Sequence, residues 1–225
     1  MNIKRLIQGI ATALILMPII ASAAGSGWYI AADEGHAHFA DIAVQTNPSV
    51  FKIGLPVGFV SSSASTQHSA FRLTGGYQFN QYWGLEASYV SLGQATINDN
   101  FLDTVGAAII TAEVQNRAHG WVLAGTGTYP FNDQWSVFAR IGAIDGYLEQ
   151  DLSIIVNGCP GCYTPIPTSV SGTAWKATYG VGVNWSFAHH WIVRLGWDQY
   201  RNLGNSNTTG EYTVNLDSIG IVYRF

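Results

Sequence analysis

The chain has 225 residues and a formal net charge of −4, with 11% charged residues, 13% aromatic residues and 25 glycines. Such a sparsely charged, acidic chain lacks the basic surface that nucleic-acid-binding proteins carry, so that class is excluded. The many aromatic and glycine residues favour β-strands joined by turns.

The first 23 residues have the pattern of a secretory signal peptide. Lys4 and Arg5 precede an apolar run, and Ala-Ser-Ala at 21–23 forms a small-residue cleavage site. The run is too short to favour a membrane-spanning helix. We predict a signal peptide over 1–23 and one domain over 24–225, whose charge becomes −4 − 2 = −6 once two basic residues are removed.

The segment that ends at Phe79 alternates between apolar and small or polar residues. Counting back in steps of two from Phe79 gives Tyr, Gly, Leu and Phe, and the intervening residues are polar or small. Because side chains alternate with period 2 along a strand, this segment is predicted to be a two-faced strand. The segment that ends at Phe187 shows the same alternation, with Trp, Tyr and Val on one face.

These bulky apolar faces favour a barrel that is apolar on its outside. A small soluble barrel would have to hold all the Trp, Tyr, Phe and Val side chains in its interior, which would overfill it. A closed membrane barrel satisfies its backbone hydrogen bonds between strands and needs only alternate residues to be apolar. We therefore predict that the apolar face contacts lipid and that small and polar residues line the lumen.

A Phe-x-x-x-Trp motif occurs three times, in "YQFNQYW", "YPFNDQW" and "NWSFAHHW". The Phe positions are separated by 131 − 79 = 52 and 187 − 131 = 56 residues, an interval that indicates a repeating unit. Each motif is predicted to be a tight periplasmic turn between aromatic residues at the membrane interface. The predicted aromatic girdle comprises Trp28, Phe79, Trp83, Phe131, Trp135, Phe187, Trp191 and Phe225.

The alternating segments predict an all-β fold, an eight-stranded antiparallel transmembrane β-barrel with an up-and-down meander. The predicted strands are Trp28–His38, Ser69–Phe79, Trp83–Leu92, Ala118–Phe131, Trp135–Gln150, Thr173–Phe187, Trp191–Leu203 and Tyr212–Phe225. Long connections are predicted at 40–67, 93–117 and 151–172, and a shorter one at 204–211. Short turns at one end and long loops at the other are typical of outer-membrane barrels.

Several of these segments resemble the OmpA-type transmembrane barrel. They are "AFRLTGGYQFNQYWGLEASYVSLG", "GTYPFNDQWSVFARIGA", "WIVRLGWDQYRNLG" and the ending "DSIGIVYRF". The resemblance implies an exported outer-membrane protein surrounded by lipid and lipopolysaccharide, with Tyr223-Arg224-Phe225 as the signal for the barrel-assembly machinery. The family often adds a periplasmic peptidoglycan-binding domain after the last strand; the chain stops at Phe225, so we expect no such anchoring role.

Strict alternation places a set of charged residues in the lumen. Glu86 lies three residues after Trp83 and Arg194 lies three after Trp191, so both are expected at the same depth and within reach of each other. Burying one ion alone is costly, so a paired network is expected. The resemblance implies the same for Glu86, Arg140 and Arg194, which match charged positions of the family. The predicted lumen residues are Glu86, Arg194, Arg140, Arg72, Lys176, Asp198 and Arg224.

Two departures and two candidate sites remain. Glu34 and Asp217 fall on the lipid face, where we expect them near the outer rim or displaced by bulges. Cys159 and Cys162, in "CPGC", are predicted to form a loop disulfide, since exported thiols usually oxidise. His36 and His38 share a face, but rim histidines are more often hydrated than metal-bound, and no metal or other cofactor is predicted.

Three classes of function fit this sequence. The first is a non-enzymatic envelope protein whose loops contact a host surface or another envelope protein; the apolar loop stretches could mark that contact or simply extend the strands. The alternative is a narrow gated channel for ions or small solutes. A lipid-modifying enzyme would need Ser, His and an acid together on the lipid face, and the adjacent His68 and Ser69 point to opposite faces, so no enzymatic activity is predicted.

Overall fold

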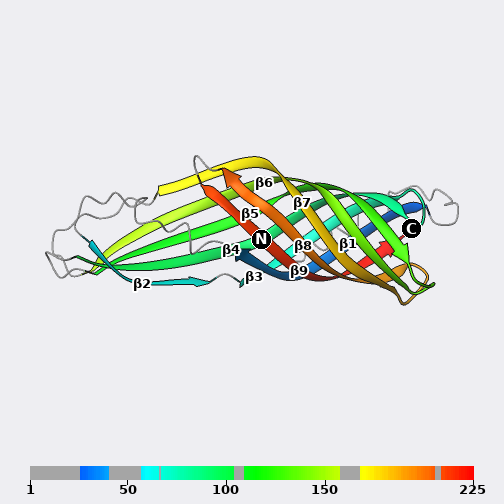
Figure 1. Cartoon of the computed structure of the whole chain (residues 1–225), viewed down its shortest axis with the longest axis horizontal. Coiled ribbons are helices and arrows are strands. Elements are labelled where there is room, and N and C mark those ends of the chain that lie inside the picture. The colour runs from blue at the N-terminus through cyan, green and yellow to red at the C-terminus, as the bar shows by residue number, and fades with distance from the viewer. Residues whose placement is uncertain (1–25, 41–56, 66, 104–108, 158–167, 206–208) are drawn as a thin grey trace, which may run out of the picture.

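In the computed structural model, residues 26–40, 57–65, 67–103, 109–157, 168–205 and 209–225 are described, and they form one antiparallel sheet closed into a barrel (Figure 1). The strands are β1 Gly27–Ala40, β2 Val57–Ser65, β3 Gln67–Gln78, β4 Trp83–Asp103, β5 Ile109–Pro130, β6 Trp135–Asn157, β7 Thr168–Ser186, β8 Trp191–Asn205 and β9 Gly210–Arg224. The described part of the chain contains no helix long and apolar enough to cross a bilayer.

Neighbouring strands pair in meander order, and β4 closes the ring because it pairs with both β3 and β5. Among the described residues β2 pairs only with β4, next to the segment of β4 that pairs with β3: Ser65 lies opposite Thr96, and Phe71 lies opposite Ser91. β2 therefore continues the course of β3, and the ring has eight strands. The predicted eight-stranded antiparallel barrel is confirmed.

The strands are longer than the sequence indicated. β4 and β5 have 21 and 22 residues, and β6 has 23, so most of the predicted connections at 93–117 and 151–172 are strand. Part of the predicted connection at 40–67 is also strand, namely β2. Figure 1 shows β2, β4, β5 and β6 continuing past the other strands at one end, and the tight turns at the opposite end. We call these the extended end and the turn end.

On β5, the outward face changes from apolar to polar along the barrel and the inward face changes from polar to apolar, which explains the extra strand residues. Near the turn end, β5 directs Leu123 and Trp121 outward and Thr126 inward; farther along, it directs Arg117 outward and Val114 inward. The period of two thus continues, but toward the extended end the apolar side chains point into the barrel and the polar side chains point outward. The prediction that the lumen holds only small and polar residues is wrong for this part of the barrel.

Close strand spacing requires glycine at selected lumen positions. A Cβ built on Gly142 of β6 would overlap the backbone oxygen of Leu123 and lie 2.7 Å from the Cα of Ala124. Neither atom belongs to a flexible side chain, so β5 and β6 would have to separate. Gly75 of β3 faces outward, and a Cβ there would meet nothing within 4 Å.

We predict that Gly142→Val prevents the barrel from closing, whereas Gly75→Val leaves it folded, because only the first substitution forces a backbone clash. The measurement is the migration of unboiled samples on a gel after refolding into detergent. A Gly142→Val protein with the same folded band as the wild type would contradict this account of the strand spacing.

Candidate functional site

In the lumen, the carboxylate of Glu86 on β4 accepts hydrogen bonds from side chains of three other strands, β1, β6 and β8. Its oxygens accept hydrogen bonds from Arg194 Nη1 at 2.8 Å and Arg140 Nη1 at 3.1 Å, and from the hydroxyl of Tyr29 at 2.9 Å. Glu86 is 1% exposed. The structure thus brings Glu86 and Arg194 together across the lumen.

A second carboxylate, Asp198 on β8, links this centre to the opposite wall. Arg140 Nε lies 2.7 Å from Asp198 Oδ1, and Arg72 Nη1 donates to Asp198 Oδ2 at 2.6 Å. Arg72 also donates from Nε to Asp33 Oδ2 at 3.1 Å. The lumen network therefore consists of three guanidinium groups and three carboxylates, with balanced formal charge; its members are Asp33, Arg72, Glu86, Arg140, Arg194 and Asp198.

The ring of Phe138 makes cation–π contacts with two of these guanidinium groups, those of Arg140 and Arg194. The guanidinium carbons of Arg140 and Arg194 each lie 4.8 Å from the ring centroid of Phe138. Such cation–π contacts are stronger when water is excluded. The amide oxygen of Asn184 accepts from Arg194 Nε at 3.1 Å, which holds this guanidinium in place.

Beyond the network, toward the extended end, the lumen is filled with apolar side chains. The buried cluster has members on β1, β4, β5, β6, β8 and β9, including Phe39, Leu92, Ile97, Leu148 and Leu216. The void lined by Tyr29 and Arg194 on the turn side has a volume of about 10 Å³, room for a single water at most. The described lumen is therefore packed, with an ionic layer followed by an apolar layer.

A bend in β8 contributes to the apolar layer. The register of β8 and β9 shifts between Tyr200 and Leu203, and Asn202 and Gly204 adopt positive φ angles of 52° and 97°. Leu203 is 2% exposed, and a Cβ on Gly146 of β6 would lie 2.8 Å from its Cδ2. The bend thus turns Leu203 inward, into the space left by a glycine of β6, two strands away in the ring.

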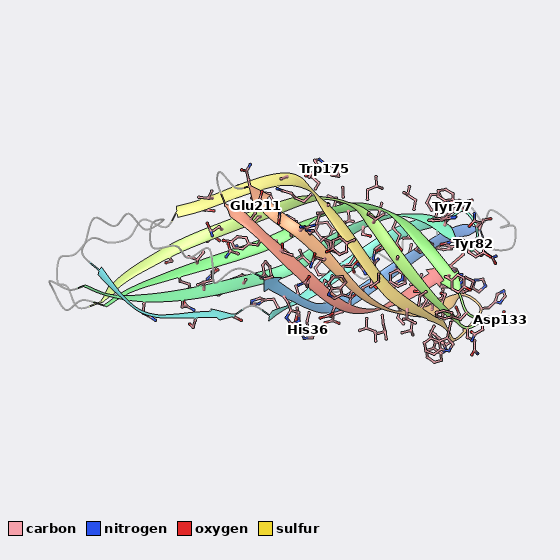
Figure 2. The ribbon with its side chains drawn as sticks, viewed as in Figure 1. His36, Tyr77, Tyr82, Asp133, Trp175 and Glu211 are labelled. Carbon is pink, nitrogen blue, oxygen red and sulfur yellow. The ribbon has the colours of Figure 1, made fainter. Side chains whose placement is uncertain are left out.

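Two predicted lumen residues lie outside the network. Lys176 Nζ donates to Glu211 Oε1 at 2.7 Å, and both side chains are partly exposed; Figure 2 shows Glu211 well away from the turn end. Arg224 lines a cavity of about 380 Å³ at the turn end. Lys176 lies away from the turn end and Arg224 lies at the turn end. At both places solvent can hydrate the charge in place of an ion-pair partner.

Sequence analysis missed Asp33 and Tyr29. Both are buried, and both lie on the β1 face opposite Trp28. The alternation that placed Glu34 outward therefore already placed its neighbour Asp33 in the lumen, and this signal was available in the sequence.

The Phe-x-x-x-Trp motifs form the tight turns of the turn end. The side-chain oxygen of Asn80 accepts from the backbone N–H groups of Tyr82 and Trp83 at 2.8 and 3.0 Å. Asn132 does the same for Gln134 and Trp135 at 2.9 and 2.8 Å. Figure 2 shows Tyr82 and Asp133 at this end. All predicted girdle residues are exposed, namely Trp28, Phe79, Trp83, Phe131, Trp135, Phe187, Trp191 and Phe225.

Glu34 and Asp217 both face outward and are exposed. The register between β1 and β9 runs without a shift, so no bulge displaces them. His38 Nε2 lies 3.6 Å from Asp217 Oδ2. Among the described residues, no three His, Cys, Asp or Glu side chains are grouped so that they could hold a metal ion. Cys159 and Cys162, and the predicted signal peptide, lie outside the described residues.

Comparison with known proteins identifies relatives over almost the whole chain. The family model described as the OmpA-like transmembrane domain matches residues 23–225. Outer membrane protein A of Salmonella typhi is 26% identical over 227 residues, covering 99% of this chain and 55% of that protein. The corresponding protein of Serratia marcescens is 25% identical, covering 99% and 56%. The chain thus spans about half the length of the curated relatives it matches.

Solved structures with a similar arrangement include two bacterial proteins. The attachment invasion locus protein Ail of Yersinia pestis has a TM-score of 0.48 and 16% identity, covering 89% of this chain and 99% of that chain. Neisserial surface protein A has a TM-score of 0.46 and 12% identity, covering 89% and 99%.

We predict that Glu86→Gln destabilises the folded barrel by about 3–5 kcal/mol, because it leaves the buried Arg194 without a carboxylate. The matched control is Lys176→Gln, which removes a partly exposed pair and is expected to cost about 0–1 kcal/mol. The free energy of unfolding of each variant is to be measured by reversible unfolding in urea in lipid vesicles. Equal costs for the two variants would mean that the lumen network does not stabilise the fold.

Proposed function

Because the chain belongs to the OmpA-like transmembrane domain family, we propose that this outer-membrane β-barrel stabilises the envelope and uses its extended end for contacts at the cell surface. The family is one of structural outer-membrane barrels and not an enzyme family. The observation that carries the proposal is the length of the strands at the extended end.

These strands are much longer than a membrane requires. β5 has 22 residues, which is about 55 Å along the barrel axis at ~3.3 Å per residue and ~40° tilt, whereas the apolar band of an outer-membrane barrel is about 25 Å tall. The turn end corresponds to the periplasmic side of such barrels, so the surplus extends outside the cell.

The outer surface of the extension is polar, as expected for a part surrounded by water. Arg117 Nη1 lies 3.4 Å from Asp151 Oδ2 and 3.8 Å from Glu149 Oε2. Gln94 bonds to both Arg117 and Gln115. Together with the apolar interior, these contacts join the strands of the extension into one continuous platform rather than a set of separate loops.

The packed lumen disfavours the alternative of a gated channel. A conduit would have to pass both the ionic layer and the apolar layer, and an apolar constriction without water is a barrier to ions. We therefore assign the charges to the stability of the barrel.

Four finer assignments complete the proposal. Residues 1–23 direct export and are removed, which leaves 24–225 as the barrel. Tyr223-Arg224-Phe225 presents the barrel to the assembly machinery, and lipopolysaccharide surrounds the outer half of its wall. Cys159 and Cys162 form a loop disulfide.

The test is to shorten the extension without disturbing the membrane part. Ala95 and Asn116 are register partners on β4 and β5, so an Asn-Gly turn between them can replace 96–115. We expect the shortened barrel to fold and to reach the outer membrane, but bacteria displaying it should lose adherence to cultured epithelial cells.

A second shortened variant serves as the comparison. Gln150 and Val170 are register partners on β6 and β7, and the same turn can replace 151–169. The difference between the two variants locates the contact surface. Adherence equal to that of the full-length barrel in both variants would rule out the extension as the contact surface.

We predict that the purified barrel gives no discrete conductance in planar bilayers, and that Glu86→Gln is also silent, because the apolar layer still closes the lumen. The recording is made at symmetric salt with a known porin as the positive control. Discrete conductance steps that change when Glu86 or Arg194 is neutralised would establish the channel instead.

A further inference from the structure

An apolar groove lies on the outer wall of the barrel, across the neighbouring strands β5, β6 and β7. Its volume is about 730 Å³, within the range of small-molecule binding sites. The residues that line it include Trp83, Gly127, Val137, Ala139 and Val181, and none of its lining residues carries a charge. A ligand of this groove must therefore be apolar where it contacts the wall.

The groove exists because small residues follow one another across the wall. Gly127 on β5 is the register partner of Trp83 on β4 and of Ala139 on β6, and Ala139 is the partner of Val181 on β7. The ring of Trp83 lies over Gly127, where a Cβ would be 3.4 Å from it. Trp83 and Val181, which are 63% and 52% exposed, thus form the two sides of the groove. Gly127 and Ala139 form its floor.

The depth of the groove places it in the periplasmic half of the membrane. Gly127 is 131 − 127 = 4 residues before Phe131, and Ala139 is 139 − 135 = 4 residues beyond Trp135. Four residues correspond to about 10 Å along the axis, less than half of an apolar band about 25 Å tall. Figure 2 shows Tyr82, which also lines the groove, at the turn end. The lipid at this depth is phospholipid of the inner leaflet.

Two tyrosines of the groove suit the polar part of such a lipid. Tyr82 and Tyr129 both line the groove and are 45% and 62% exposed. A tyrosine at a membrane interface combines an apolar ring with a hydroxyl that needs a polar partner. The ester and phosphate oxygens of a phospholipid are such partners, while its acyl chain matches the uncharged groove.

We propose that this groove binds one acyl chain of an inner-leaflet phospholipid as a discrete ligand. A chain that lies on a row of protruding side chains contacts protein on one side only. Between Trp83 and Val181 it contacts the two sides and the floor, so it makes more dispersion contacts per methylene. The site rests on the orientation of the barrel proposed above and is independent of adherence through the extended end.

Two glycines at the same depth provide a matched pair of variants. Gly127 is four residues before Phe131, and Gly75 on β3 is 79 − 75 = 4 residues before Phe79. Gly127 lines the groove and Gly75 does not. A leucine at 127 occupies the floor and displaces the chain, and each methylene that loses its contact weakens binding about fourfold. A leucine at 75 has room, since a Cβ there would meet nothing within 4 Å.

The experiment counts the lipids that the folded barrel retains. Each variant is placed in nanodiscs of phosphatidylethanolamine, with and without lipopolysaccharide, and is then released into detergent for native mass spectrometry. We expect one phosphatidylethanolamine on the wild type and on Gly75→Leu, and an occupancy at least about tenfold lower on Gly127→Leu, as the loss of two methylene contacts implies. The unboiled gel band confirms that each variant is folded.

A diazirine in the acyl chain of phosphatidylethanolamine gives a second measurement. Crosslinks should map to residues 127–139 and 181–183 in the wild type and be lost there in Gly127→Leu. The proposal is overturned if Gly127→Leu retains as much phosphatidylethanolamine as Gly75→Leu, or if lipopolysaccharide takes its place. A wild-type dimer without lipid would also overturn it and would make the groove a contact between two copies. None of these results bears on adherence, which the shortened variants test separately.

Discussion

Each strand residue of a closed barrel faces either the lumen or the outer wall, and the medium on the outer wall changes from lipid to water along the axis. The same alternation must therefore place apolar side chains outside in the membrane part and polar side chains outside beyond it. Going along β5 from the turn end toward the extended end, Trp121 is the last large apolar side chain on the outside, and Arg117 and Gln115 follow it. On the inside of the same stretch, Ala118 and Val114 are buried. On β5, the extension begins at this point of exchange.

The ion network follows from the same constraint on the other side of the wall. In the membrane part the apolar residues face outward, so the lumen receives the polar ones, and a narrow lumen without bulk water must satisfy them internally. Three guanidinium groups and three carboxylates do so in one connected set. The aromatic ring of Phe138, whose centroid lies 4.8 Å from the guanidinium carbons of both Arg140 and Arg194, adds cation–π contacts to the same set.

Local sequence was sufficient for the features that depend on neighbours in the chain. The Phe-x-x-x-Trp motifs located the turns, and the alternation located the strands and the sides that Glu86 and Arg194 face. Strand length was underestimated because the reversed alternation after Trp121 has the composition of a loop. The contact between Arg72 and Asp198 was not specified by the sequence for another reason: it depends on which side chains of distant strands meet in the lumen, and no local pattern encodes that register.

The separation along the chain of the residues in the network has a consequence for how the barrel assembles. Arg72 and Asp198 are 126 positions apart, and Glu86 and Arg194 are 108 positions apart. Within the network only Arg72 and Asp33 lie on two paired strands, β1 and β3; the partners of Glu86 and Asp198 come from strands farther round the ring, so a partly built sheet keeps most of its interior ions hydrated and its core open. The remaining ions are neutralised and dehydrated only as the ring closes, and contacts between residues so far apart in the chain make that step slow.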